Sequence, residues 1–213
     1  MRTVRNGHLD YGPTPFDLRH VFQAYWTYTL PFGKGRLWGG WTLSGIHRIT
    51  SGHVFQLTTG YQTMNNLGDA GTVLNNLTAQ QLQGMFNTFS SSATRGVLNF
   101  VNPSLIGSDG RSNLQYVSPN TTPGAFGAFV YLYGPSVFSN DLALLKEIPI
   151  KENLRFGFQV EALNAFNHPV FSDVAPTNGT TATTVNVTST TFGQTSTLLV
   201  GPRQLQLRAY LQW

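Results

Sequence analysis

Few residues in this chain have the types and spacing that metal or catalytic chemistry requires. The five histidines show neither the HExxH pattern nor any other ligand spacing, so the sequence predicts no metal site; they are His8, His20, His47, His53 and His168. Cysteine is absent, which excludes disulfides and thiolate ligands. We also expect no cofactor, because GKGR at 33–36 lacks the flanks of a phosphate-binding loop and is better interpreted as a hairpin turn.

Three carboxylates offer the strongest case for catalysis. Asp141, Glu147 and Glu161 could face one another on neighbouring strands, as the acid pair of a glycosidase does. The alternative is that they are polar positions of a pore wall, paired with Arg155 or Lys151 across the ladder. We prefer the alternative, because nothing around them indicates an organised site. The chain has no GxSxG nucleophile elbow, and we expect it not to be an enzyme.

The composition is unusual for a water-soluble domain. Hydrophobic residues make up 40% of the 213 residues and aromatic residues 13%. Charged residues make up only 10%, against about 25% in a typical soluble protein. Such a chain is too aromatic and too weakly charged to be disordered, and it suits short strands joined by polar turns. The net charge of +4 comes from scattered basic residues, so we expect no nucleic-acid partner.

The sequence contains no continuous apolar run of about 18 residues, the length that a membrane-spanning helix needs. Its start, MRTVRNGHLDYGPTP, carries two arginines but no apolar stretch, so it does not have the pattern of a signal peptide. If the protein is exported, we therefore expect this chain to be a piece of a longer one.

Several segments alternate between apolar and polar residues, as strands with two different faces do. Most are close to the 9–11 residues that a tilted strand needs to cross a bilayer. The segments are LRHVFQAYWTYTL (18–30), GWTLSGIHRIT (40–50), HVFQLTTG (53–60), VFSNDLALLKEIPI (137–150), NLRFGFQVEALNAFN (153–167), TFGQTSTLLV (191–200) and LQLRAYLQW (205–213). The first two predict an antiparallel hairpin with a short turn. Helical periodicity of useful length is absent, and the predicted fold class is all-β.

Two stretches lack this alternation. Residues 61–125 predict a long irregular loop, in which TAQQLQGMF (78–86) has the pattern of one or two helical turns capped by Thr78. Residues 172–190 predict a second loop, which is rich in threonine. Long loops of membrane barrels lie on the extracellular side, and we expect ligand contacts to come from these two.

The alternation fits either a transmembrane β-barrel or a water-soluble β-sandwich. Aromatic residues gather near the ends of the first two predicted strands, as in an aromatic girdle at the lipid headgroups; they are Trp26, Tyr28, Phe32, Trp38 and Trp41. The last segment is amphipathic up to Trp213, and a soluble protein would risk aggregation by exposing such a strand. Both observations favour the barrel.

Specific motifs add a resemblance to a known family. They are DYGPTPFDLRHVFQAYWTYTLPFGKGR, GGWTLSGIHRITSGHVF, GPSVFSNDLALLKEIPIKENLRFGFQVEALNAFNHPVF and the closing GPRQLQLRAYLQW. The chain from about residue 10 to 213 resembles the C-terminal barrel portion of Oar-like TonB-dependent receptors of acidobacterial type, which usually begin with a carboxypeptidase-regulatory-like domain. NAFNHPVF (164–171) is the most specific part, while His53 stands where the family more often has proline.

The resemblance implies a receptor in the outer membrane of a Gram-negative bacterium. Its complete barrel would have roughly 22 strands and enclose an N-terminal plug. It would take up a scarce nutrient, a carbohydrate or a peptide product, with energy delivered through TonB. Residues 1–213 would be the C-terminal segment of that barrel, without plug or Ton box. The partners implied are outer-membrane lipid, TonB through the plug, an unidentified small nutrient, and the barrel-assembly machinery. The machinery would recognise a C-terminal signal made of Leu207, Leu211 and Trp213.

Alternation then assigns a face to individual residues, subject to β-bulges. The predicted lumen-facing residues are Arg19, Arg48, Arg155, Glu161, Gln206 and Arg208. The predicted lipid-facing residues are Phe22, Trp26, Leu43, Phe156, Phe158, Leu207 and Leu211. Two other functions stay open: a surface or adhesion barrel that does not transport, and a soluble sugar-binding sandwich.

Overall fold

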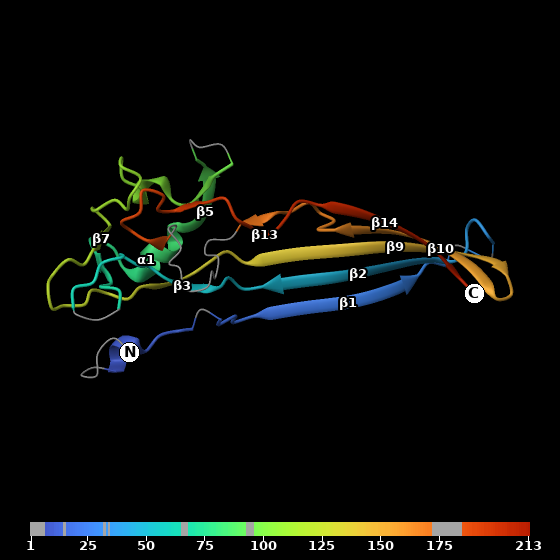
Figure 1. The fold of residues 1–213 in the computed structure, drawn as a ribbon, viewed down its shortest axis with the longest axis horizontal. Helices are drawn as coiled ribbons and strands as arrows, with labels where there is room; N and C mark the ends of the chain where they lie inside the picture. Colours follow the sequence, from blue (N-terminus) through green and yellow to red (C-terminus); the bar gives the residue numbers. More distant parts are fainter. Residues whose placement is uncertain are drawn as a thin grey trace. The chain divides into compact units, whose positions relative to one another are not determined.

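The computed structural model describes residues 7–14, 16–31, 33, 35–64, 68–92, 96–171 and 185–213. These residues divide into two compact units (Figure 1). Unit 1 comprises residues 1–18, 51–135 and 171–197, and unit 2 comprises residues 19–50, 136–170 and 198–213. Phe32 of the predicted girdle and residues 172–184 of the predicted Thr-rich loop lie outside the described residues.

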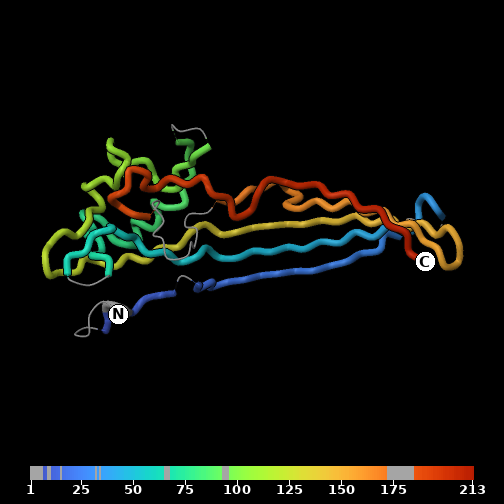
Figure 2. Tube along the Cα trace, viewed as in Figure 1, coloured from blue at the N-terminus to red at the C-terminus, as the bar shows by residue number. Residues whose placement is uncertain are grey.

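Unit 2 is built on one antiparallel sheet of five strands. In spatial order these are β1 (Val21–Thr29), β2 (Trp41–Thr50), β9 (Val137–Lys151), β10 (Leu154–Leu163) and β14 (Gln204–Gln212). The long strands run beside one another in Figures 1 and 2. Four of them have nine or ten residues, and β9 has 15. The predicted antiparallel strands are confirmed; the barrel is not closed, because β1 and β14 each pair on one side only within the described sheet.

The order of strands along the chain equals their order across the sheet, so the sheet is an up-and-down meander. Residues Glu152 and Asn153 join β9 to β10 in a tight turn, followed by a register shift between Leu154 and Arg155. The connection from β1 to β2 covers residues 30–40, which is longer than the predicted short turn. Residues 51–136 and 164–203 separate the other neighbours, and most of these two long connections belongs to unit 1.

Unit 1 has a hydrophobic core of its own. Phe86 lies at its centre, with ring centroids 5.5 Å from Phe100, 5.6 Å from Phe55 and 6.5 Å from Phe192. Small ladders surround these rings, in the pairings β3–β8, β4–β7 and β5–β6–β12. Their bounds are β3 (Val54–Gln56), β4 (Thr72–Leu74), β5 (Phe86–Ser91), β6 (Leu98–Val101), β7 (Val117–Pro119), β8 (Tyr131–Tyr133) and β12 (Gln194–Thr195). The prediction of an irregular loop over 61–125 is therefore wrong, because strands of three to six residues are too short to show alternation.

The predicted helical turns are confirmed as α1 (Ala79–Gly84). Thr78 caps the helix in a capping box with Gln81, which satisfies two amide groups at the helix start. Leu82 is fully buried in the core of unit 1. Two 3-10 turns, η1 (Gly7–Asp10) and η2 (Pro103–Leu105), and the short strands β11 (Val170–Phe171) and β13 (Leu198–Val200) complete the elements. No helix among the described residues is long and apolar enough to cross a membrane.

Candidate functional site

The register of the five long strands gives their sheet two chemically different faces. Trp26, Gly45, Leu142, Ala162 and Leu205 lie opposite one another in successive strand pairs. Because successive side chains of a strand point to opposite faces, this row fixes the face of the other residues in register. The face that contains the row carries all seven predicted lipid-facing residues, and we call it the apolar face.

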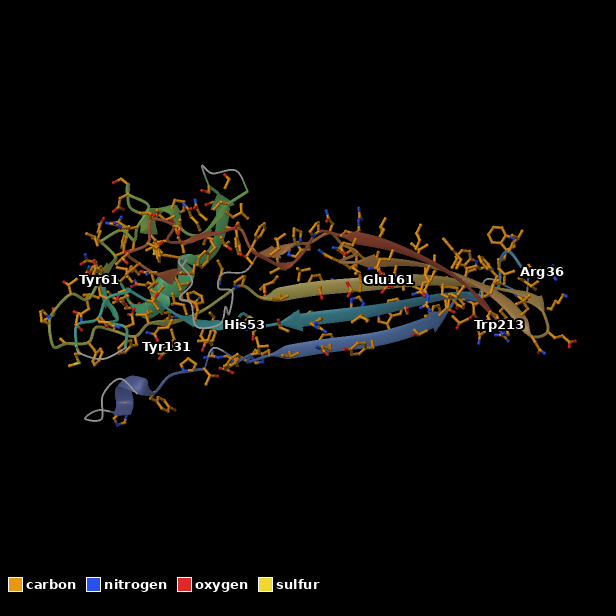
Figure 3. The ribbon with its side chains drawn as sticks, in the orientation of Figure 1. Arg36, His53, Tyr61, Tyr131, Glu161 and Trp213 are labelled. Carbon is orange, nitrogen blue, oxygen red and sulfur yellow. The ribbon has the colours of Figure 1, made fainter. Side chains whose placement is uncertain are left out.

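The opposite face, here called the polar face, carries five of the six predicted lumen-facing residues. They are Arg48, Arg155, Glu161, Gln206 and Arg208. Glu161 lies near the middle of the sheet in Figure 3. Arg19 precedes β1 and lies outside the strand register, so the sheet assigns it no face. The common face is a structural fact, while its contact with a lumen stays a prediction.

The three carboxylates singled out in the sequence lie on the polar face but do not form the predicted ion pairs. Glu161 is opposite Ala143 and Gln206, so the register gives it no cation as a direct neighbour. Asp141 accepts a hydrogen bond from the Asn164 amide (2.8 Å), and Tyr210 donates to Glu147 (3.4 Å). Among the described residues, no ion pair joins these carboxylates to Arg155 or Lys151.

The apolar face is uncovered at the β14 edge of the sheet. Leu207 is 71% exposed and Leu211 53% exposed, and Phe22 at the opposite edge is 58% exposed. Trp213 follows β14 directly and is almost fully exposed, near the end of the sheet in Figure 3. Large apolar side chains in this state need a cover other than water.

A polar network lies on the apolar face, and the sequence analysis missed it. Trp26 Nε1 donates to His47 Nε2 (2.8 Å), and His47 Nδ1 forms a short hydrogen bond with Asn140 Oδ1. The two rings stack with centroids 6.1 Å apart, over a site where Gly45 has no side chain to obstruct them. Asn140 is only 2% exposed. The sequence contained one signal for this network: His47 and Asn140 are polar residues at positions where the alternation of their strands places apolar side chains.

Lys146 is a further polar residue on the apolar face, after His47 and Asn140, and it is only 6% exposed. Its Nζ donates to the Leu37 carbonyl (3.0 Å) and to the Gly39 carbonyl, and it lies 5.1 Å from the centroid of the Trp41 ring. Beside it, a hollow of about 510 Å³ is lined by Leu30, Leu37, Trp38, Trp41 and Leu144. Trp38 and Trp41 thus lie next to a strand end, as a girdle requires. The prediction that Trp26 also lies near a strand end is wrong, because Trp26 lies in the middle part of β1.

Unit 1 contains a separate cavity of about 900 Å³. Its wall comes from residues 59–61, 106–109, 111–114, 119 and 186–188. It therefore draws on both of the loops that we expected to contact a ligand. No group of three metal-ligating side chains occurs in the part of the chain that the structure describes.

The profile of the family described as "Outer membrane beta barrel domain" matches residues 1–206 of this chain. No curated protein and no solved structure matches significantly.

Proposed function

Since the chain belongs to the outer membrane beta barrel domain family and therefore lies in the outer membrane, we propose that it forms part of the wall of a TonB-dependent receptor that takes up a scarce nutrient. The two-faced sheet of unit 2 carries the proposal. Its apolar face would contact lipid, and its polar face would line the passage. Family membership also overturns the alternative of a water-soluble sandwich.

The strand lengths support a membrane-spanning wall. Strands of nine or ten residues match the 9–11 residues that cross a bilayer at about 45°. The two outermost strands support a larger barrel. Backbone groups in lipid must be hydrogen-bonded, so the free edges of β1 and β14 need further strands as partners. Five strands are too few for closure, because known single-chain barrels begin at about eight.

The long connections support a receptor rather than a simple pore. Residues from both connections build the core of unit 1, so these loops form a folded body instead of extended turns. Loops of this size on barrels commonly lie outside the cell, where a nutrient is first captured.

The proposal is tested by deleting the gene in its host and measuring uptake of a labelled panel of oligosaccharides and peptides. We expect uptake of at least one compound to fall to background in the deletion strain, and to fall equally in the parent strain when an uncoupler collapses the proton gradient. Restoration of the intact gene should restore uptake. A deletion strain that takes up every compound like its parent would overturn the transport proposal.

A second candidate is a surface barrel that binds without transporting. The separate core of unit 1 favours it, because a loop body with 13 buried hydrophobic residues among those that the structure describes can act as a stable binding module. This candidate predicts unchanged uptake in the deletion strain, together with altered attachment of the cells to surfaces or to one another.

A further inference from the structure

The cavity of unit 1 is a built feature with walls held together by hydrogen bonds. The segment around Thr58 is fixed to the segment around Val187 by two of them, Thr58 N to Val185 O (3.1 Å) and Val187 N to Thr58 O (2.9 Å). The Ser112 amide donates to Val187 O (3.0 Å), which attaches the third segment. Val187 is buried in the hydrophobic core, so the cavity wall rests on rigid packing.

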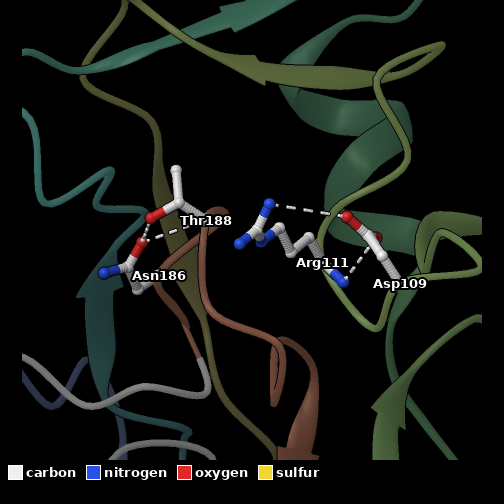
Figure 4. Close-up of polar contacts among 4 residues, drawn as sticks. All are labelled: Asp109, Arg111, Asn186 and Thr188. Atoms are coloured by element: carbon white, nitrogen blue, oxygen red, sulfur yellow. Dashed lines mark hydrogen bonds and ion pairs between the residues drawn. The ribbon is translucent and has the colours of Figure 1, made fainter.

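A tight turn presents a charged pair at one side of this cavity. Gly107 N donates to Arg111 O (2.7 Å), and the turn between them contains Asp109 and Gly110. Gly110 has φ +81° and faces the Thr190 carbonyl so closely that a Cβ there would overlap it. Asp109 Oδ1 accepts from the Arg111 amide (3.0 Å), and its Oδ2 lies 3.7 Å from the guanidinium (Figure 4). The turn therefore holds the Asp109 carboxylate and places the exposed Arg111 guanidinium beside it.

Asn186 provides an oriented amide at the cavity wall. Its Oδ1 accepts hydrogen bonds from the Thr188 amide (3.0 Å) and hydroxyl (2.8 Å), as Figure 4 shows. This orientation leaves Nδ2 as the free end, and among the described residues it has no hydrogen-bond partner. The Arg111 guanidinium also has more N–H groups than its single contact with Asp109 uses. Two residues that line the cavity, Arg111 and Asn186, thus keep donors that no described residue uses.

The charges of the wall select the class of ligand. Asp109 and Arg111 are the charged residues among the described wall residues, and they are opposite in sign and paired. An anionic ligand that binds Arg111, the one cation among the described wall residues, would be repelled by the Asp109 carboxylate beside it. A peptide would need a free anion and a free cation for its two charged ends, whereas the one cation and the one anion among the described wall residues bind each other. A neutral ligand rich in hydroxyl groups meets neither difficulty, because hydroxyls accept from amides and guanidinium and donate to carboxylate.

We propose that this cavity binds a neutral saccharide. Arg111 and Asn186 donate hydrogen bonds to its hydroxyl groups, Asp109 accepts one, and Tyr61 packs against the apolar side of the sugar ring. Tyr61 lines the cavity and is about half exposed, so its ring is available for such a contact. Only the biological role of this site, capture of a sugar for uptake, rests on the receptor function proposed above. Binding itself can be measured without transport.

The test is direct binding by the full-length protein, purified in detergent. The probes are neutral malto-, cello- and xylo-oligosaccharides, with galacturonate oligosaccharides and tripeptides for comparison. We expect at least one neutral oligosaccharide to bind with an affinity that is the same at low and high salt, since a neutral ligand has no ionic attraction to screen. Arg111→Ala and Asn186→Leu should each weaken binding about tenfold or more, as the loss of a hydrogen bond in a ligand site does.

Arg203→Ala is the matched control for Arg111→Ala, because it removes another exposed arginine, in unit 2, that does not line the cavity. It should bind like the unaltered protein. Binding of the galacturonate or peptide probes alone, no binding by any probe, or full affinity in both cavity variants would overturn the saccharide site. Nutrient uptake that persists in such a case would leave the receptor function standing. Saccharide binding that depends on the cavity, together with unchanged uptake in the deletion strain, would support the saccharide site and overturn the transport function.

Discussion

Leu207→Arg tests the assignment of the apolar face to lipid. Leu207 lies in the middle part of β14, opposite Val160 of β10, and 71% of its surface is uncovered by the protein. If the apolar face contacts lipid, the new guanidinium enters hydrocarbon. If the face contacts water, the same change is mild.

The expected loss of stability depends on how deep residue 207 lies in the bilayer. An arginine at the bilayer midplane of a barrel destabilises it by about 2–4 kcal/mol. Since about 1.4 kcal/mol is a factor of ten, the folding equilibrium in lipid should shift by roughly 30- to 1,000-fold toward the unfolded state. The neighbouring Gln206→Arg is the matched control, because it places the same side chain one residue away on the polar face. Its cost should be close to zero.

The assay is urea unfolding of the full-length protein in lipid vesicles, followed by tryptophan fluorescence and by the change in gel mobility on heating. Leu207→Arg should lower the urea midpoint strongly, or prevent the folded band, while Gln206→Arg keeps both at their original values. Equal stability of the two variants would refute the face assignment, and a greater loss in Gln206→Arg would invert it.

Three further substitutions probe packing that the fold requires. Gly45→Ala puts a methyl group 2.6 Å from a tryptophan ring and should cost about 1–3 kcal/mol in urea unfolding, whereas Gly35→Ala, in open space, should cost little. Asn140→Ala leaves an imidazole nitrogen of His47 without its partner and should cost about 1–3 kcal/mol in the same assay. Leu82→Ala should cost unit 1 about 2–5 kcal/mol, seen as faster protease cleavage within residues 51–135 while the heat-dependent gel mobility stays unchanged.

The five long strands were predictable because each carries its own signal. A strand with one apolar and one polar face alternates along its whole length, and nine or ten residues are enough to show the period. The common face of Arg155, Glu161 and Arg208 followed from the same period, since strands in register keep their phase across a sheet. The helix α1 was also predictable, because the pattern of its cap is local.

The fold of unit 1 and its cavity were not predictable by this reasoning. The core of unit 1 joins residues as distant as Phe55 and Phe192, and strands of two or three residues show no period. The cavity depends on contacts such as that of Ser112 with Val187, which only the folded chain creates. One local signal was available: Asp109–Gly110 is a turn sequence, and the residues that flank such a turn are held in defined positions.

The polar network on the apolar face explains why two polar residues occur at positions where the alternation predicts apolar ones. The two residues bind each other across neighbouring strands. His47 and Asn140 each interrupt the apolar phase of a strand, and either alone would place an unpaired polar group on the apolar face, which is costly if that face contacts lipid. The register between β2 and β9 sets them directly opposite, and Trp26 reaches His47 diagonally from β1. Each therefore satisfies the other, and a shift by one residue would separate them. Because a displaced β2 would leave all three polar groups without partners, and a displaced β1 or β9 would break one of the two bonds, the network favours this register over its alternatives.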